Sequence, residues 1–151
     1  MKKFFIMLAV WFVAITAIII GSYVYPKFQS ADYDDVAVPY LKKVIPELSQ
    51  WDPAAARAFM VTEVSASIPE EKLVRGMATF SKLGALQSLA EPKFENVYRD
   101  QGTIIGKQTI VEYNTEAKYA NGNATINMKL LDRGGYFEIY HFNISSQALI
   151  E

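Results

Sequence analysis

The chain has 151 residues, with 15 lysines and arginines, 16 aspartates and glutamates, and no cysteine. The absence of cysteine excludes disulfide bonds, thiolate nucleophiles and cysteine-ligated metals. A net charge of −1 without a basic cluster is also unsuited to binding nucleic acid, which needs a basic stripe.

An apolar run from Phe4 to Tyr25 follows Lys2 and Lys3 and contains no charged residue. At a rise of about 1.5 Å per residue, a helix of that length spans roughly 30 Å, the hydrocarbon thickness of a bilayer. The run therefore predicts an N-terminal transmembrane helix. Tyr23 and Tyr25 stand where interfacial aromatic residues usually lie.

A cleaved signal peptide is the alternative to a retained anchor. Signal peptides have a shorter apolar core, about 7–15 residues, and small residues before the cleavage site. Cleavage after Gly21 would place the bulky Ile19 at the minus-three position, which fits poorly. We therefore expect a retained anchor, whose helix ends at Pro26.

The charges beside the apolar run predict its orientation. Lys2 and Lys3 precede it and acidic residues follow it, so the positive-inside rule keeps the N-terminus in the cytoplasm. We expect a single-pass protein of the inner membrane, with a periplasmic or extracellular body, or a secreted protein if the run is cleaved. The predicted parts are an anchor at 1–25, a linker at 26–33 and a domain at 34–151.

The first half of the body has a helical pattern. Apolar residues at helical spacing predict a helix from near Asp34 that Pro46 kinks or ends. Asp52-Pro53 begins a second helix, because an acceptor at the N-cap precedes proline at the first helical position. Ser67 and Glu70 form the pattern of a capping box for a third helix, which ends at Gly84.

The second half has the alternating pattern of strands. Predicted strands cover 94–99, 103–119, 124–130 and 136–146, with turns at 100–102, 121–122 and 132–135. The apolar residues change face near Tyr140 and His141, which predicts a β-bulge. The expected fold is α+β: after the transmembrane helix, about three short helices pack on a curved antiparallel sheet of four or so strands.

This order of elements resembles the cone-shaped, cystatin-like fold of the nuclear transport factor two superfamily. The stretch from Gly135 to Ser145 is similar to the last strands of that superfamily, and Phe80–Leu86 is similar to a helix-to-strand join of small bacterial envelope proteins. The resemblance covers residues 34–146. It implies the fold but no activity, because the superfamily contains isomerases, dehydratases and proteins without catalysis.

Candidate catalytic groups are few. His141 is the only histidine and is either a general base or a strand residue with a satisfied hydrogen bond. Glu112 and Glu116 share a strand face roughly 13 Å apart, beyond the about 5–9.5 Å of glycosidase carboxylate pairs. We therefore predict no catalytic residue, no metal site and no cofactor.

Aromatic residues supply the candidate ligand-binding residues. Tyr113, Tyr119 and Phe137 are expected beneath the helices, where they either line an apolar cavity or form a packed core. Tyr98 and His141 complete the set.

The leading hypothesis is a non-enzymatic, membrane-tethered extracytoplasmic domain that binds a partner protein or forms a homo-oligomer through its sheet. Its contact with the membrane is Phe4–Tyr25. The alternatives are binding of a small apolar ligand in the cone and an unrecognised isomerase-like or hydrolase-like enzyme that uses His141 or Glu112.

Overall fold

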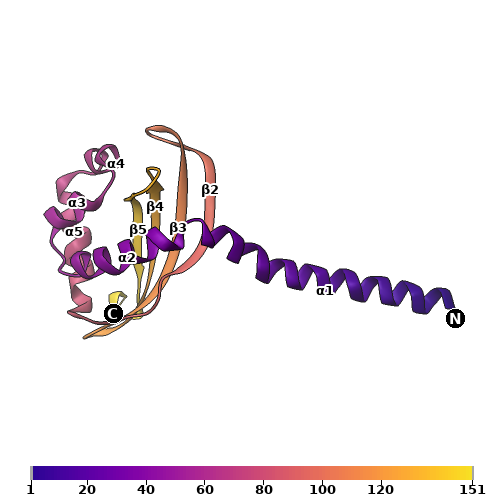
Figure 1. Cartoon of the computed structure of the whole chain (residues 1–151). Helices are drawn as coiled ribbons and strands as arrows, with labels where there is room; N and C mark the ends of the chain where they lie inside the picture. Colours follow the sequence, from indigo (N-terminus) through magenta and orange to yellow (C-terminus); the bar gives the residue numbers. More distant parts are fainter. Residues whose placement is uncertain (1, 151) are drawn as a thin grey trace. The chain divides into compact units, whose positions relative to one another are not determined.

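The computed structural model describes residues 2–150, except for the side chains of residues 2–5, 23 and 26–29 (Figure 1). The chain divides into two compact units, Met1–Asp32 and Tyr33–Glu151.

Helix α1 (Lys2–Ala31) forms the first unit. Among the described residues, no helix combines the length and the apolar character that crossing a membrane requires. The side chains of Phe4 and Tyr23 lie outside the described set, and the predicted transmembrane helix stays a prediction. The expected end of the helix at Pro26 is wrong. A proline lacks one backbone donor but its φ angle is compatible with a helix, and α1 continues to Ala31.

The second unit begins with helices. Their bounds are α2 Asp34–Leu48, α3 Pro53–Phe59, α4 Thr62–Ser67 and α5 Glu70–Phe80, followed by a 3₁₀ turn, η1 Ser81–Leu83. The start of α3 is confirmed, since Asp52 Oδ1 accepts a hydrogen bond from the Ala54 amide at 2.9 Å. Helix α4 was not predicted. Met60 and Val61 separate it from α3, because Met60 adopts extended backbone and Val61 has a non-helical ψ of 128°.

The predicted capping box is wrong. Ser67 lies at the end of α4, where its hydroxyl donates to the Val64 carbonyl at 2.7 Å. Glu70 accepts a hydrogen bond from Arg57 at 3.0 Å instead of reaching back to a helix N-cap. The glycine stop is confirmed: Gly84 follows η1 with a φ of 76°, in the left-handed region that favours glycine.

The strands are β1 Leu86–Leu89, β2 Lys93–Thr103, β3 Gly106–Tyr119, β4 Gly122–Asp132 and β5 Phe137–Ser145, and a short 3₁₀ turn, η2 Gln147–Leu149, follows. They form one antiparallel sheet in which β4 lies between β3 and β5, and both β1 and β2 pair with β3. The α+β class is therefore confirmed, with one strand more than expected. Strand β1 is too short to show a clear alternation in the sequence.

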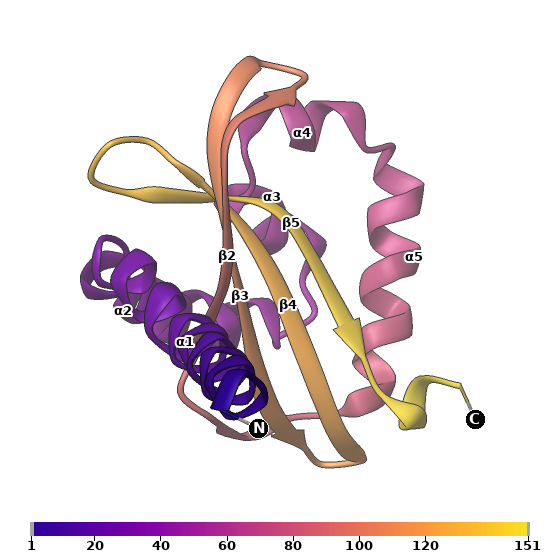
Figure 2. The same cartoon turned by 90° about the vertical axis from the view of Figure 1, so that its right-hand side faces the viewer.

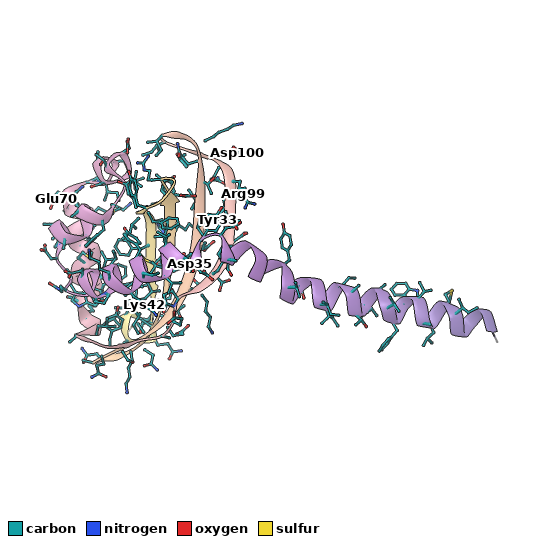
Figure 3. The ribbon with its side chains drawn as sticks, viewed as in Figure 1. Tyr33, Asp35, Lys42, Glu70, Arg99 and Asp100 are labelled. Atoms are coloured by element: carbon teal, nitrogen blue, oxygen red, sulfur yellow. The ribbon has the colours of Figure 1, made fainter. Side chains whose placement is uncertain are left out.

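Two predicted irregularities have different outcomes. The turn expected at 100–102 is wrong, because β2 continues to Thr103 with Asp100 at a φ of 53° and a shift in register beside it (Figure 3). The bulge at Tyr140 is confirmed: Lys129 pairs with His141 and Leu130 with Ile139, so Tyr140 is the extra residue.

The hydrophobic core lies between the helices and one face of the sheet. The alternating residues of β3, Val111 to Tyr119, are buried as predicted, as are Ala124 to Leu130 on β4. Residues of α2, among them Leu41, pack in the same cluster. Strands β2 to β5 lie side by side, with α5 beyond β5 (Figure 2).

Arg57 joins three helices through its guanidinium. It donates to the Ser65 carbonyl at 2.6 Å and the Ile68 carbonyl at 3.0 Å, and it pairs with Glu70 at 2.9 Å. These bonds tie the end of α3 to the end of α4 and the start of α5.

Replacing Arg57 should therefore weaken the fold. We expect Arg57→Met to lower the free energy of unfolding by about 1–2 kcal/mol, because two carbonyls lose a charged donor. Arg75→Met is the matched control, since the Arg75–Glu71 pair is exposed and contributes about 0.5 kcal/mol or less. Urea unfolding of the two variants measures the difference, and equal effects would contradict a structural role for Arg57.

Candidate functional site

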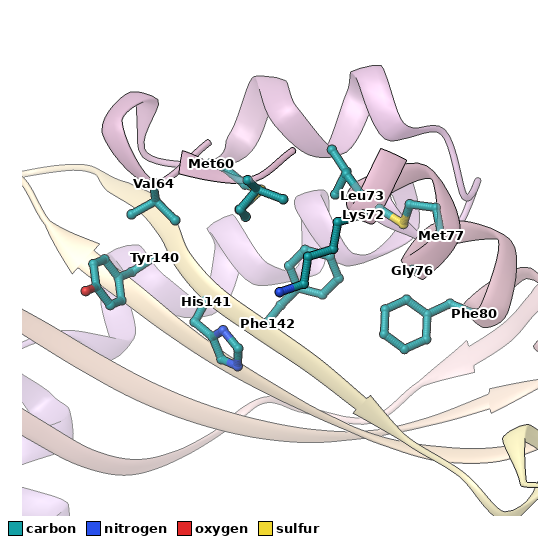
Figure 4. Close-up of a pocket in the computed structure, with 11 residues that line it drawn as sticks. Met60, Val64, Lys72, Leu73, Gly76, Met77, Phe80, Tyr140, His141 and Phe142 are labelled. Atoms are coloured by element: carbon teal, nitrogen blue, oxygen red, sulfur yellow. The ribbon is translucent and has the colours of Figure 1, made fainter. Parts of the chain in front are cut away.

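A groove of about 260 Å³ lies between helix α5 and strand β5 (Figure 4). Its floor and walls are mainly apolar. The lining residues are Met60, Val64, Ile68, Lys72, Leu73, Gly76, Met77, Phe80, Tyr140, His141 and Phe142.

The groove exists because β5 is the last strand of the sheet and α5 runs beside it. Met60 and Val61 cover one point of this edge: Met60 forms a parallel bridge with Ile139, and the Val61 amide donates to the Ile139 carbonyl at 2.9 Å. The chain then leaves the edge to form α4. The groove begins at the next residues of β5, Tyr140 and His141.

Gly76 lines the groove on the α5 side. It lies in the interior of α5, and a Cβ atom built on it meets no heavy atom within 4 Å apart from its own helix backbone. Packing therefore does not require glycine here. The missing side chain exposes a stretch of α5 backbone opposite β5.

The charges at the groove are positive. Lys72 extends from α5 into the groove toward β5 (Figure 4). A second hollow, lined by Lys129 and Ile104 among others, adjoins the groove at Tyr140 and His141, which line both. Neither Lys72 nor Lys129 forms an ion pair within the described part of the chain.

Three of the predicted ligand-binding residues lie in the core, away from the groove. Tyr113, Tyr119 and Phe137 are 1%, 1% and 6% exposed. The Tyr113 hydroxyl donates to Asp34 at 2.7 Å, and the Tyr119 hydroxyl shares a hydrogen bond with Ser49 at 2.9 Å. Burial and the neighbouring Asp34 carboxylate raise the pKa of Tyr113 far above its ordinary value.

The other two predicted residues belong to a polar cluster on the opposite face of the sheet. Tyr98 donates to Glu112 at 2.7 Å, Asn127 donates to Glu112 at 2.6 Å, and the Lys129 ammonium lies 5.4 Å from the centre of the Tyr98 ring. His141 pairs with Lys129 across β4 and β5 and also lines the groove. The five predicted residues therefore do not form one site.

The surroundings of Glu112 and His141 lower the pKa of both side chains. Burial raises the pKa of Glu112, but hydrogen bonds from Tyr98 and Asn127 and the charge of Lys129 outweigh it, so the pKa is lowered. Burial and the positive charge of Lys129 lower the pKa of His141, and Glu112 partly offsets them. Glu112 is thus a weak base with both oxygens occupied, and His141 is neutral at pH 7.

No group of three or more histidine, cysteine, aspartate or glutamate residues that could hold a metal ion occurs among the described residues. The geometry is instead that of a surface groove with an apolar floor, Lys72 extending into it and a strand edge along one side, with Lys129 in the adjoining hollow. Sequence reasoning missed it because its walls come from segments about sixty residues apart. The one signal in the sequence was Gly76 inside a strong helical pattern.

Comparison of the chain with protein-family models, with curated proteins and with solved structures finds no match. The resemblance to the nuclear transport factor two superfamily stays a prediction.

The single histidine allows a direct test of the electrostatics. We expect the NMR titration of His141 to give a pKa below 6.5, and Lys129→Met to raise it, because a positive neighbour is removed. The free energy of unfolding should also fall as the pH drops through about 6.5, since the unfolded chain binds this proton more readily. Lys118→Met, on the same sheet face, should leave the pKa unchanged; an equal rise in both variants would contradict the arrangement.

A second test concerns Gly76. We expect Gly76→Ala to raise the free energy of unfolding by about 0.5–1 kcal/mol, because alanine restricts the unfolded chain and finds open space in the fold. Ala78→Gly, at an exposed position of the same helix outside the groove, should lower it by a similar amount. Urea unfolding compares both with the parent chain, and a destabilised Gly76→Ala would show that packing requires the glycine.

Proposed function

We propose that the chain is a non-enzymatic, membrane-tethered domain that binds a partner protein in the groove between α5 and β5. The observation that carries the proposal is Gly76. An interior helical glycine costs about 1 kcal/mol relative to alanine, and here no packing contact compensates for it. Local rules are broken in this way mainly at functional sites. What the glycine provides is room in the groove.

The residues around Gly76 support a binding role. Leu73, Met77 and Phe80 come from α5 and Phe142 from β5, so the groove offers apolar surface to an occupant. Phe80 and Phe142 pack against each other in the lining, with their ring centroids 6.1 Å apart. Methionines such as Met60 and Met77 adapt their shape to different partners.

The membrane tether rests on α1. Its described side chains from Ile6 to Ser22 are exposed on every side, and a helix that is apolar all round is suited to an apolar surrounding. The hydroxyls of Thr16 and Ser22 donate to carbonyls of their own helix at 2.7 and 2.8 Å, which lowers the cost of placing them in lipid. By the positive-inside rule the tethered domain lies outside the cytoplasm. We also retain the cone-like fold of the nuclear transport factor two superfamily as a proposal.

The state of Glu112 supports a role without catalysis. A general base should have a pKa near the working pH, whereas the pKa of Glu112 is lowered by its hydrogen bonds. Its two oxygens already accept bonds from Tyr98 and Asn127. A substrate proton would have to compete with both donors.

A small apolar ligand is the second candidate occupant, and the apolar lining of the groove favours it. The volume of about 260 Å³ is just below the range of ordinary small-molecule sites, which runs from about 300 to 1,000 Å³. The open, elongated groove is better suited to part of a larger partner.

The proposal predicts the behaviour of two matched variants. In the native membrane, chemical crosslinking of the full chain should give a complex that Gly76→Ala weakens and Gly76→Trp abolishes, because a methyl group takes up part of the room that glycine leaves and an indole fills it. Gel mobility and mass spectrometry of the crosslinked product measure this, with thermal unfolding to show that Gly76→Trp is folded.

Two outcomes would contradict the proposal. A complex that survives Gly76→Trp would place the partner elsewhere. A parent chain that forms no complex, but retains a small added mass in native mass spectra that Gly76→Trp loses, would identify the small-ligand alternative.

A further inference from the structure

Building on the proposed function, we infer that the partner inserts an extended, acidic peptide segment that adds as a strand to the free edge of β5, with a carboxylate at Lys72. This inference concerns the conformation and charge of the occupant. It can fail while the groove remains the binding site.

The first argument is the backbone of β5. In an antiparallel pair, alternate residues turn their N–H and C=O groups toward the next strand, and at the end of a sheet these groups have no strand partner. Strand β5 has β4 on one side, and beyond the bridge at Ile139 no further strand pairs with its other side in the described chain. Residues 140–142 line the groove along this edge.

The second argument is that the chain already uses this edge in the proposed manner. Met60 is extended and forms a parallel bridge with Ile139, and the Val61 amide donates to the Ile139 carbonyl at 2.9 Å. They show that an extended segment fits against β5 at the start of the groove. A peptide bound beyond them would pair with the edge from His141 onward, past the bulge at Tyr140.

The third argument is the pattern of side-chain sites. A strand on this edge presents alternate side chains to opposite sides. One side faces the apolar residues of the groove, such as Leu73, Met77 and Phe142. The occupant should therefore alternate apolar and polar residues, whereas a helical occupant would carry apolar residues at a spacing of three and four.

The fourth argument is charge. The residues that line the groove and the adjoining hollow include two cationic residues, Lys72 and Lys129, but no aspartate or glutamate. Glu112 interacts electrostatically with Lys129 and His141, but Tyr98 and Asn127 bind its oxygens. The ammonium of Lys72 lacks an ion pair in the described structure and points into the groove, so a carboxylate of the peptide complements it.

The probe is a phage-displayed library of random nonapeptides, selected against the full chain in detergent. We expect selected peptides to alternate apolar residues with polar ones that include aspartate or glutamate. Their binding to Gly76→Ala should be weaker than to the parent chain, and their binding to Gly76→Trp at least tenfold weaker. Apolar residues at helical spacing, or binding that Gly76→Trp leaves unchanged, would overturn the inference.

Backbone methylation tests the strand pairing. Synthetic versions of one selected peptide, each N-methylated at a different residue, should lose affinity at least tenfold at alternate positions. Those amides face β5, and the intervening ones do not. A loss that does not alternate along the peptide would overturn strand addition.

A charge exchange tests the role of Lys72. Lys72→Glu should weaken the binding of the acidic peptide at least tenfold. A peptide with lysine in place of the acidic residue should bind the Lys72→Glu variant with the original affinity. Lys82→Glu, in η1 outside the groove, is the control and should have little effect. Equal losses for the two variants would overturn the contact.

Failure of the inference and failure of the proposed function are distinguishable. If the selection yields no peptide but the crosslinked complex still depends on the space at Gly76, the partner binds the groove in another conformation. If formation of the crosslinked complex does not depend on the space at Gly76 either, both the inference and the proposed function are wrong.

Discussion

The free edge of β5 is the constraint on which the rest of the domain depends. A strand at the end of a sheet exposes unpaired backbone groups that other chains can bind, so native proteins cover or interrupt such edges. Here Met60 and Val61 cover the edge at Ile139, and the bulge at Tyr140 changes its direction just beyond. To reach that position the chain must break its helix between α3 and α4. Arg57 then holds the two helices and the start of α5 together, and α5 returns beside the uncovered part of β5.

Sequence reasoning predicted the features that depend on local patterns. The alternation from Val111 to Tyr119 identified the buried face of β3, because one face of a half-buried strand must be apolar. The change of face near Tyr140 identified the bulge for the same reason. Features that depend on distant contacts were mispredicted: Ser67 and Glu70 have the spacing of a capping box, but Glu70 pairs with Arg57, thirteen residues away in sequence.

The candidate site was hidden from the sequence for a related reason. The aromatic residues suggested a ligand cavity, but they lie on opposite faces of the sheet. Tyr113, Tyr119 and Phe137 belong to the core, whereas Tyr98 binds Glu112 on the other face. The groove combines an α5 helix with a β5 edge, and no residue spacing links the two. The sequence analysis did not single out Gly76, which is the one residue that could have pointed to the groove because it weakens its own helix. The structure supplies the reason, since the position faces open space opposite β5.

Photo-crosslinking from Tyr140 tests most directly whether the groove is where the partner binds. A benzophenone amino acid at Tyr140 replaces one aromatic residue of the groove by another, and the same replacement at Tyr136, 60% exposed and outside the groove, is the matched control. In the native membrane, light should join the partner to position 140 and not to position 136, and the attached residues should belong to one short segment of the partner. Crosslinks from position 136 alone, or equally from both positions, would show that the partner binds another surface.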